Sequence, residues 1–231
     1  ISPLIIFLFL HSIMLPNHSA LLFTLALAIP TLHAIPAAAP PLRPPKGAVT
    51  ITSLSTSHMG SGCPPSSVSI NLAPDNSALT LIFDAFVAAD GPKAIATTTR
   101  ALCKVTVGLD AAGWVFDVAS VDFRGYVLLE AGVEASLVSR WKWVDAGGKD
   151  LKGKGHAQKK LSGPFEDDVL LHKEGEMSDV EPSVCQKKDA RLQISLSATV
   201  DAGGGKRNGY VQGSSADAAF REIMNMKWRK C

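Results

Sequence analysis

The sequence has no marked excess of charge of either sign. Its 23 basic and 21 acidic side chains leave a formal net charge of +2 over 231 residues. This balance excludes a strongly basic nucleic-acid-binding protein and a protein with an acidic tail, so we expect no nucleic-acid partner. The sequence also lacks a regular alternation of strand and helix patterns, which argues against a doubly wound α/β fold.

The first part of the chain lacks charged residues altogether. None occurs between Ile1 and Leu32, where two apolar runs lie at 4–10 and 20–29. Neither run reaches the roughly 20 residues that a membrane-spanning helix needs. A signal peptide fits better, and with Met14 as the initiator it ends after Ala34. We therefore expect residues 1–34 to hold a signal peptide, and the protein to be secreted and extracellular, without a stable membrane anchor.

Proline and alanine dominate the next segment, residues 35–47. Proline at this frequency disfavours both helix and sheet, so we expect an extended linker. The remaining residues, 48–231, are then expected to form a single domain.

Cysteines are few and widely spaced, with no two closer than 40 positions. Zinc ligands usually occur as close pairs, and the three histidines that follow Ala34 are also isolated, so we expect no metal and no cofactor. An even number of cysteines in a secreted chain predicts two disulfides, for which three pairings are open. We favour the bonding of chain neighbours, namely Cys63–Cys103 and Cys185–Cys231.

Alternation of apolar and polar residues is the dominant pattern of the remaining chain. It is clearest at 101–109 and 192–200, where every second residue is apolar. Such a period of two is typical of half-buried strands, and turn-forming residues separate the runs. We expect an all-β fold, an antiparallel β-sandwich that is jelly-roll-like. Weaker runs of the same kind lie at 49–54, 68–72, 79–87, 114–121, 125–129 and 135–144.

Two segments are ambiguous. Residues 214–226 fit either a helix or a strand, and we favour a strand because Cys231 must reach its disulfide partner. Residues 147–160 are rich in glycine and lysine. We expect them to form a long mobile loop that is either a solvated insertion or a weak contact to a polyanion.

Several short motifs, taken in order, point to a known family. They lie at 61–64, 79–84, 100–103, 121–126, 162–165 and 228–231 and read SGCP, LTLIFD, RALC, VDFRGY, SGPF and WRKC. Together they resemble the secreted domain-of-unknown-function 4360 family. The resemblance implies a secreted, disulfide-bonded, mainly β domain, and it implies no activity. The sequence departs from the family pattern at 149–160 and 216–222.

The first candidate site consists of three polar residues at every second position of one short segment. Asp122, Arg124 and Tyr126 project from one face if their segment is a strand, where they could bind a sugar or a carboxylate. The alternative is an ion pair that fixes a turn at Gly125.

Asp84 is the second candidate, because it interrupts the apolar run at 79–87. A buried carboxylate needs a partner, which Arg100 or Arg124 could supply. The alternative is a catalytic carboxylate paired with Glu130 or Glu134.

Trp141 and Trp143 share one strand face. An exposed pair would stack against sugars, but a core position is the better interpretation for large aromatic side chains.

No local catalytic signature such as G-x-S-x-G is present. Our leading hypothesis is a non-enzymatic module that binds carbohydrate at a cell wall or host surface. An extracellular polysaccharide hydrolase or lyase is the alternative that the carboxylates suggest. A secreted fungal effector that contacts a host surface protein is a further alternative, and the sequence does not separate it from the first.

Overall fold

The computed structural model describes residues 42–231 except 58–60, 97, 178–184, 186–188 and 205. The expected signal peptide and residues 35–41 of the expected linker lie outside the described residues. Within the described part, thirteen strands pair in antiparallel fashion into two sheets. The strands are β1 (Thr50–Ser57), β2 (Val68–Leu72), β3 (Ala78–Phe83), β4 (Ala88–Asp90), β5 (Arg100–Asp110), β6 (Trp114–Leu129), β7 (Glu134–Val144), β8 (Asp150–Ser162), β9 (Phe165–Glu174), β10 (Glu176–Met177), β11 (Arg191–Asp201), β12 (Gly209–Gln212) and β13 (Phe220–Lys230).

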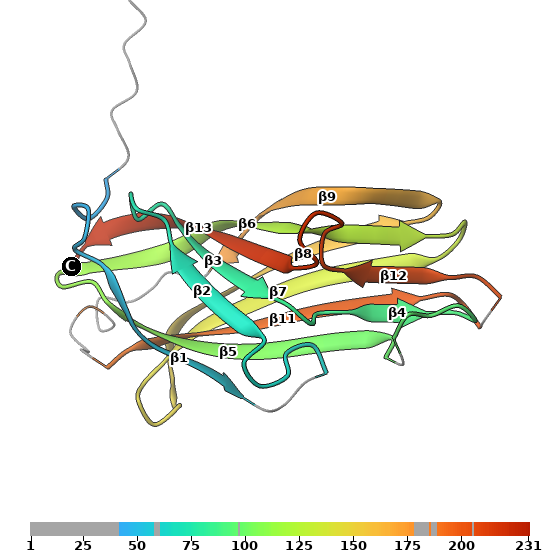
Figure 1. Cartoon of the computed structure of the whole chain (residues 1–231). Helices are drawn as coiled ribbons and strands as arrows, with labels where there is room; N and C mark the ends of the chain where they lie inside the picture. Colours follow the sequence, from blue (N-terminus) through green and yellow to red (C-terminus); the bar gives the residue numbers. More distant parts are fainter. Residues whose placement is uncertain (1–41, 58–60, 97, 178–184, 186–188, 205) are drawn as a thin grey trace, which may run out of the picture. The chain divides into compact units, whose positions relative to one another are not determined.

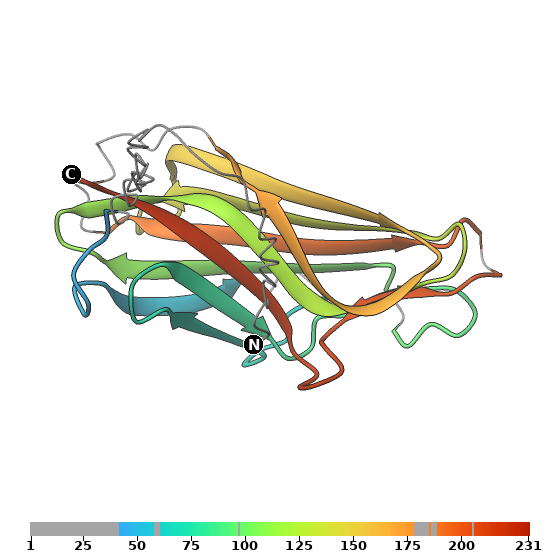
Figure 2. The ribbon, with the colours of Figure 1, turned by 90° about the horizontal axis from the view of Figure 1, so that it is seen from above.

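The two sheets lie face to face, and their strands run in roughly the same direction (Figures 1 and 2). Sheet A has the order β1-β5-β11-β7-β8-β10. Sheet B has the order β2-β3-β13-β6-β12-β4, with β9 paired to β6 as well. Aligned packing of two antiparallel sheets around one core is the arrangement of a β-sandwich, so the expected fold class is confirmed.

Alternation places one face of each strand in the core. In β11 the apolar residues Leu192, Ile194 and Leu196 are buried, whereas Gln193 and Ser195 between them are half-buried on the outer face. The neighbouring strand β5 follows the same rule, with Cys103, Val105 and Val107 buried. Since side chains in a strand point to opposite faces in turn, the pattern fixes which face of sheet A meets sheet B.

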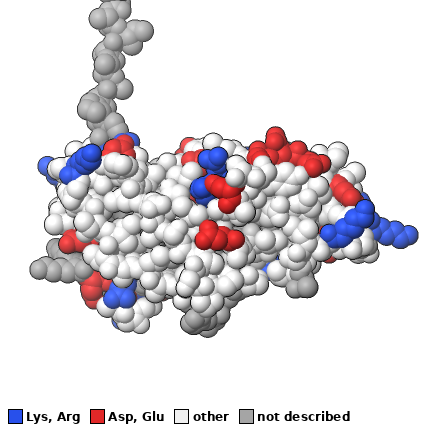
Figure 3. Space-filling view, viewed as in Figure 1, with Lys and Arg blue, Asp and Glu red and all other residues white. Residues whose placement is uncertain are grey.

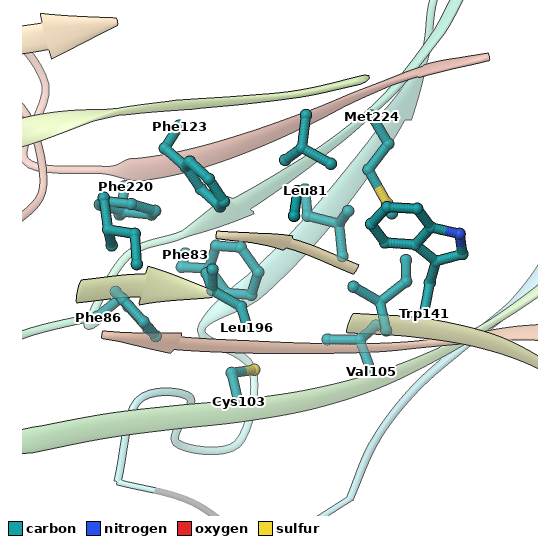
Figure 4. Packing of buried hydrophobic residues seen from close by; sticks show 14 of the residues in the cluster. Leu81, Phe83, Phe86, Cys103, Val105, Phe123, Trp141, Leu196, Phe220 and Met224 are labelled. Atoms are coloured by element: carbon teal, nitrogen blue, oxygen red, sulfur yellow. The ribbon is translucent and has the colours of Figure 1, made fainter. Parts of the chain in front are cut away.

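Aromatic side chains fill the core between the sheets (Figure 4). Phe86 lies 5.7 Å from Phe83 and 5.0 Å from Phe220, measured between ring centroids. Trp141 and Trp143 are only 5% and 6% exposed, which confirms their predicted core position. Pairs of this kind add about 0.5–1.5 kcal/mol to the stability gained from burial alone.

Both predicted disulfides are present. Cys63 is bonded to Cys103 on β5, and Cys185 is bonded to Cys231, which follows β13. Their sequence separations of 40 and 46 residues predict that each bond contributes about 4 kcal/mol by restricting the unfolded chain.

The last residues of the expected linker contact the sandwich. The Asn76 side-chain amide donates to the carbonyl oxygens of Pro44 and Pro45 at 3.2 and 3.1 Å. Arg43 forms an ion pair with Asp75 at 2.5 Å. The carbonyl oxygen of Asn76 in turn accepts a hydrogen bond from the Trp228 indole. The turn between β2 and β3 therefore anchors the chain before the first strand begins.

The prediction of a long loop at 147–160 is wrong. Only a short turn separates β7 from β8, and β8 pairs with β7 from Asp150 to Ser162. The glycines have a packing role here, since Gly155 lies opposite Trp141, and a Cβ on Gly155 would come within 2.5 Å of that indole. A large aromatic side chain covering a glycine on the next strand stabilises the pair, so this segment forms a strand despite its composition.

The end of β3 and the start of β13 can also be compared with the sequence predictions. The run expected at 79–87 ends as a strand at Phe83, and Asp84 and Ala85 form a turn. In the ambiguous segment 214–226, a turn occupies 215–217 and β13 begins at Phe220, so the preference for a strand is confirmed.

The packing of Trp141 on Gly155 yields a first prediction. Gly155→Ala should lower the free energy of unfolding by roughly 1–3 kcal/mol, because the new methyl group overlaps the indole and Trp141 must move. Gly147→Ala, whose Cβ meets nothing nearer than the Asp145 carboxylate oxygen at 3.4 Å, should have little effect. Denaturant unfolding of the two variants checks the prediction, and equal stabilities would contradict it.

Candidate functional site

The five residues singled out from the sequence do not lie together. Asp84 is exposed in the turn after β3, so it is not the buried carboxylate that the strand prediction required. It also has no ion pair among the described residues. Arg100 is exposed at the start of β5 in sheet A. Asp122, Arg124 and Tyr126 lie on the outer face of β6 in sheet B, as the period of two predicts.

Asp122 belongs to a hydrogen-bonded network on that outer face. One carboxylate oxygen lies 2.5 Å from His172 Nδ1, and the other accepts a hydrogen bond from the Asn225 amide at 2.8 Å. His172 Nε2 lies 3.1 Å from Glu174. The hydrogen bond to Asp122, followed by that to Glu174, raises the pKa of His172 above its usual value. Both carboxylates thus bind the same imidazole, and the contact with Asp122 joins β6 to β9.

Tyr126 and its neighbours are also paired within the sheet. The Tyr126 hydroxyl donates to Glu166 at 2.7 Å, which raises the pKa of the phenol, and its ring stacks on Tyr210 with centroids 5.8 Å apart. Asp168 accepts hydrogen bonds from the hydroxyl and the backbone N–H of Ser215, and these lower its pKa.

The outer face of sheet B is therefore largely satisfied by its own cross-strand pairs. Acidic side chains gather where β9 runs, at the upper right of the space-filling view (Figure 3). Because its carboxylates already have partners, this face is better explained as a structural network than as a binding site.

The carboxylates that a hydrolase would use are likewise dispersed. Glu130 accepts hydrogen bonds from the backbone and side-chain nitrogens of Asn208 at 2.8 and 3.0 Å, which lower its pKa. Glu134 is exposed at the start of β7. In the described ranges, no group of three or more His, Cys, Asp or Glu residues has the arrangement of a metal site.

A hollow of about 790 Å³ lies instead on the outer side of sheet A, and we call it the basic hollow. Strands β5, β11, β7, β8 and β10 all contribute to it, so it crosses most of the sheet. Its volume falls within the roughly 300–1,000 Å³ typical of ligand sites. The lining residues are Lys104, Arg140, Trp141, Lys142, Lys154, Gly155, His156, Glu176, Gln193 and Ser195.

Strand register aligns these residues in rows. Ser195 on β11 lies between Lys104 on β5 and Arg140 on β7, and His156 on β8 lies opposite Arg140. A second row begins two residues away and holds Gln193, Lys142 and Lys154. Side chains directly opposite in a sheet are neighbours, so each row forms a continuous polar strip across the strands.

The charge of the basic hollow is strongly one-sided. Its lining contains four permanent cations but only one carboxylate, that of Glu176, which lies 3.4 Å from His156. Lys142 forms an ion pair with Asp150 at 2.5 Å. Neither Lys104 nor Arg140 has a carboxylate partner among the residues that the structure describes. These two groups are therefore available to an anion from outside.

The rows also place basic side chains opposite each other. Lys142 faces Lys154, and Arg140 faces His156. This register gathers basic groups on the outer face of sheet A.

Trp141 connects the basic hollow to the core. Its indole packs inward, yet it also lines the hollow beside Gly155. In Figure 4 its nitrogen points away from the other labelled side chains. The hollow therefore has an aromatic border beneath its lysine and arginine side chains.

A buried carboxyl is present where the sequence prediction had not placed one. Glu222 on β13 is fully buried, lies opposite Leu81 and Phe123, and accepts a hydrogen bond from Ser139 on β7 of the other sheet. Burial raises the pKa of Glu222 to about 7, while the Ser139 hydrogen bond lowers it to a smaller extent.

Sequence reasoning missed both the basic hollow and Glu222, but only Glu222 had a local signal. Glu222 shares the every-second-residue register of Phe220, Met224 and Trp228, which places it on the core face once β13 is taken as a strand. The hollow had no such signal, since its residues are spread from Lys104 to Ser195 and only strand order brings them together.

A comparison with known protein families identifies the family to which this chain belongs. The family described as Domain of unknown function (DUF4360) matches residues 48–231. The chain belongs to this family. The DUF4360 match covers every strand of the sandwich and both disulfides, as the resemblance of the short motifs implied.

One relative is a protein of the fungus Arthroderma benhamiae described as an uncharacterized secreted protein. It is 31% identical over 173 residues, which make up 74% of this chain and 68% of the relative.

Similarity to solved structures is low. A candidate glycoside hydrolase from Bacteroides thetaiotaomicron is 8% identical with a TM-score of 0.28, and the match covers 71% of this chain and 57% of that one. The chain thus spans little more than half of that structure. A candidate sugar-binding protein from the same organism is 9% identical with a TM-score of 0.27, with coverage of 84% and 96%.

Among the described residues, no helix has the length and apolar character that crossing a bilayer requires.

The buried carboxyl of Glu222 yields a second prediction. Its pKa is about 7 when folded and near 4.5 when unfolded, so its stabilising contribution is complete below pH 4.5 and is lost as pH rises through 7. Glu222→Gln removes this titration. The free energy of unfolding of the native protein, taken relative to that of Glu222→Gln, should fall by about 3 kcal/mol as the pH rises from 4.5 to 7.

Denaturant unfolding across this pH range measures that difference. His172 also loses stabilisation as pH rises through its raised pKa, but it does so in both proteins and cancels. Glu134→Gln, which neutralises an exposed carboxyl on β7, serves as the control. Parallel stability profiles for Glu222→Gln and the native protein would contradict the assignment.

Proposed function

We propose that the protein is a secreted, non-enzymatic module that binds carbohydrate at a cell wall or host surface. The basic hollow on sheet A is the binding site. The observation that carries this proposal is a hollow of ligand size whose polar side chains come from five adjacent strands. They include Lys104 and Arg140, which have no carboxylate partner among the described residues.

The side chains of the basic hollow suit a hydroxyl-rich ligand. Gln193 and Ser195 offer both hydrogen-bond donors and acceptors, and they lie on β11 at the centre of the site. Arg140 offers a fixed fork of donors. Trp141, which is only 5% exposed, gives the hollow a rigid apolar border rather than an open stacking surface.

A binding role explains the site better than catalysis does. Glycoside hydrolysis requires two carboxyl groups held roughly 5–9.5 Å apart beside the scissile bond. The lining of the basic hollow contains one carboxylate, Glu176, and it is already adjacent to His156. The remaining candidates, Asp84, Asp122 and Glu130, lie elsewhere in the described structure, and the last two are held in hydrogen bonds.

Secretion supports an extracellular ligand. The N-terminal sequence pattern, two disulfides and a secreted relative all agree with export. We propose that residues 1–34 are removed during export and that residues 35–41 continue as a linker.

The export proposal gives a third prediction. N-terminal sequencing of the exported protein should begin at Ile35, because Ala34 provides the small residue that signal cleavage prefers directly before the cut. Mass spectrometry of the intact protein should give the matching mass with no free thiol. A start within residues 1–34 would contradict this assignment.

The binding proposal gives a fourth prediction. The whole chain, with both disulfides formed, should bind at least one insoluble wall polysaccharide in a pull-down assay. Ser195→Trp should abolish that binding, because the large ring occupies the centre of the basic hollow. Ser69→Trp, which places the same ring on an exposed position of β2 in sheet B, is the control. Absence of binding to every wall polymer, or release of soluble sugar by the native protein, would contradict the proposal.

A further inference from the structure

We infer that the ligand of the basic hollow is an acidic polysaccharide, whose carboxylate or sulfate groups bind Lys104 and Arg140. This inference rests on the proposed function and names the ligand class of the same site. It follows from the charges in the hollow, the register of the strands and the absence of intramolecular partners for these two side chains among the described residues.

Lys104 and Arg140 form two separated anchor points. Ser195 lies between them in register, so their backbones are two strand spacings apart, or about 10 Å. Two cations on strands at this separation favour a ligand with anions repeated along a chain over a single small anion. A polymer lying across the strands meets both cations, with Ser195 placed to bind a hydroxyl group between them.

The second row extends the positive surface along the strands. Lys142 and Lys154 lie two residues from Arg140 and His156 on β7 and β8, which is about 7 Å away. Lys142 also forms an ion pair with Asp150. A polymer that binds Lys104 and Arg140 therefore also meets the positive charge of this row.

Arginine and a carboxylate suit each other in shape as well as in charge. The guanidinium group donates two parallel hydrogen bonds to the two oxygens of a carboxylate. Sulfate esters offer the same pairing. Both groups are found on acidic polysaccharides, so the shared chemistry is an anionic oxygen pair on a sugar chain.

A nucleic acid fits the hollow less well. Single-stranded nucleic acids are bound through aromatic side chains on which successive bases stack. The one aromatic residue of the hollow, Trp141, is 5% exposed and packs into the core. The net charge of +2 is also far from that of a strongly basic nucleic-acid-binding protein.

The test compares charged polysaccharides with neutral ones of the same backbone. Calorimetry with the whole chain should show binding to polygalacturonate but not to fully methyl-esterified pectin, and to dextran sulfate but not to dextran. The stronger ligand of the two identifies carboxylate or sulfate as the preferred group. Binding should weaken steeply from about 0.01 M to 1 M salt, because the Debye length falls from roughly 30 Å to 3 Å.

Variants assign the binding to these residues. Lys104→Gln and Arg140→Gln should each weaken binding roughly tenfold, and the double variant roughly a hundredfold, because each removes one of two separate charge contacts to the polymer. Arg124→Gln removes an exposed cation from the outer face of sheet B and should leave affinity unchanged. Thermal unfolding confirms that each variant folds.

Other outcomes separate this inference from the proposed function. Salt-insensitive binding of neutral polysaccharide that Ser195→Trp abolishes would overturn the acidic ligand and leave the binding module in place. Equal binding of a single-stranded oligonucleotide through Lys104 and Arg140 would also overturn it. Binding to no polysaccharide, charged or neutral, overturns both.

Discussion

Each strand of the sandwich can bury only one of its two faces, and the rest of the structure depends on this constraint. The apolar core takes one face of β5, β11, β7, β6, β13 and β3. Polar side chains must then lie on the two outer faces or form hydrogen bonds within the core. The outer face of sheet B meets this demand with cross-strand pairs such as Asp122–His172 and Tyr126–Glu166. The outer face of sheet A leaves Lys104 and Arg140 without a carboxylate partner in the described residues.

Glu222 is the exception to this arrangement, because its ionisable side chain lies within the apolar core. It lies at an inward position, and its only hydrogen-bond partner in the described structure is Ser139 of the opposite sheet. An ionised carboxylate there has little solvation, so the folded protein favours the protonated form. This carboxyl joins the two sheets, and the cost of its burial depends on its charge.

Sequence patterns predicted most of the sandwich because the relevant signals are local. Strands such as β5 and β11 alternate along their whole length, and four widely spaced cysteines allow few pairings. The pattern failed at β8, where Gly155 depends on the indole of Trp141 from the neighbouring strand. It failed at Asp84, where the strand ends at Phe83 although the apolar run continues. The basic hollow could not be predicted, because alignment of Lys104, Arg140 and Lys154 requires strand order and register that no single segment encodes.

The concentration of cations over the hollow of sheet A has a consequence for how the domain meets a large surface. The lining of the hollow holds four permanent cations and one carboxylate. On sheet B, carboxylates such as Asp122 have cross-strand partners, and cations such as Arg124 lie among them. An extended anionic surface therefore attracts the side of sheet A more strongly, so the approaching domain turns its hollow toward that surface.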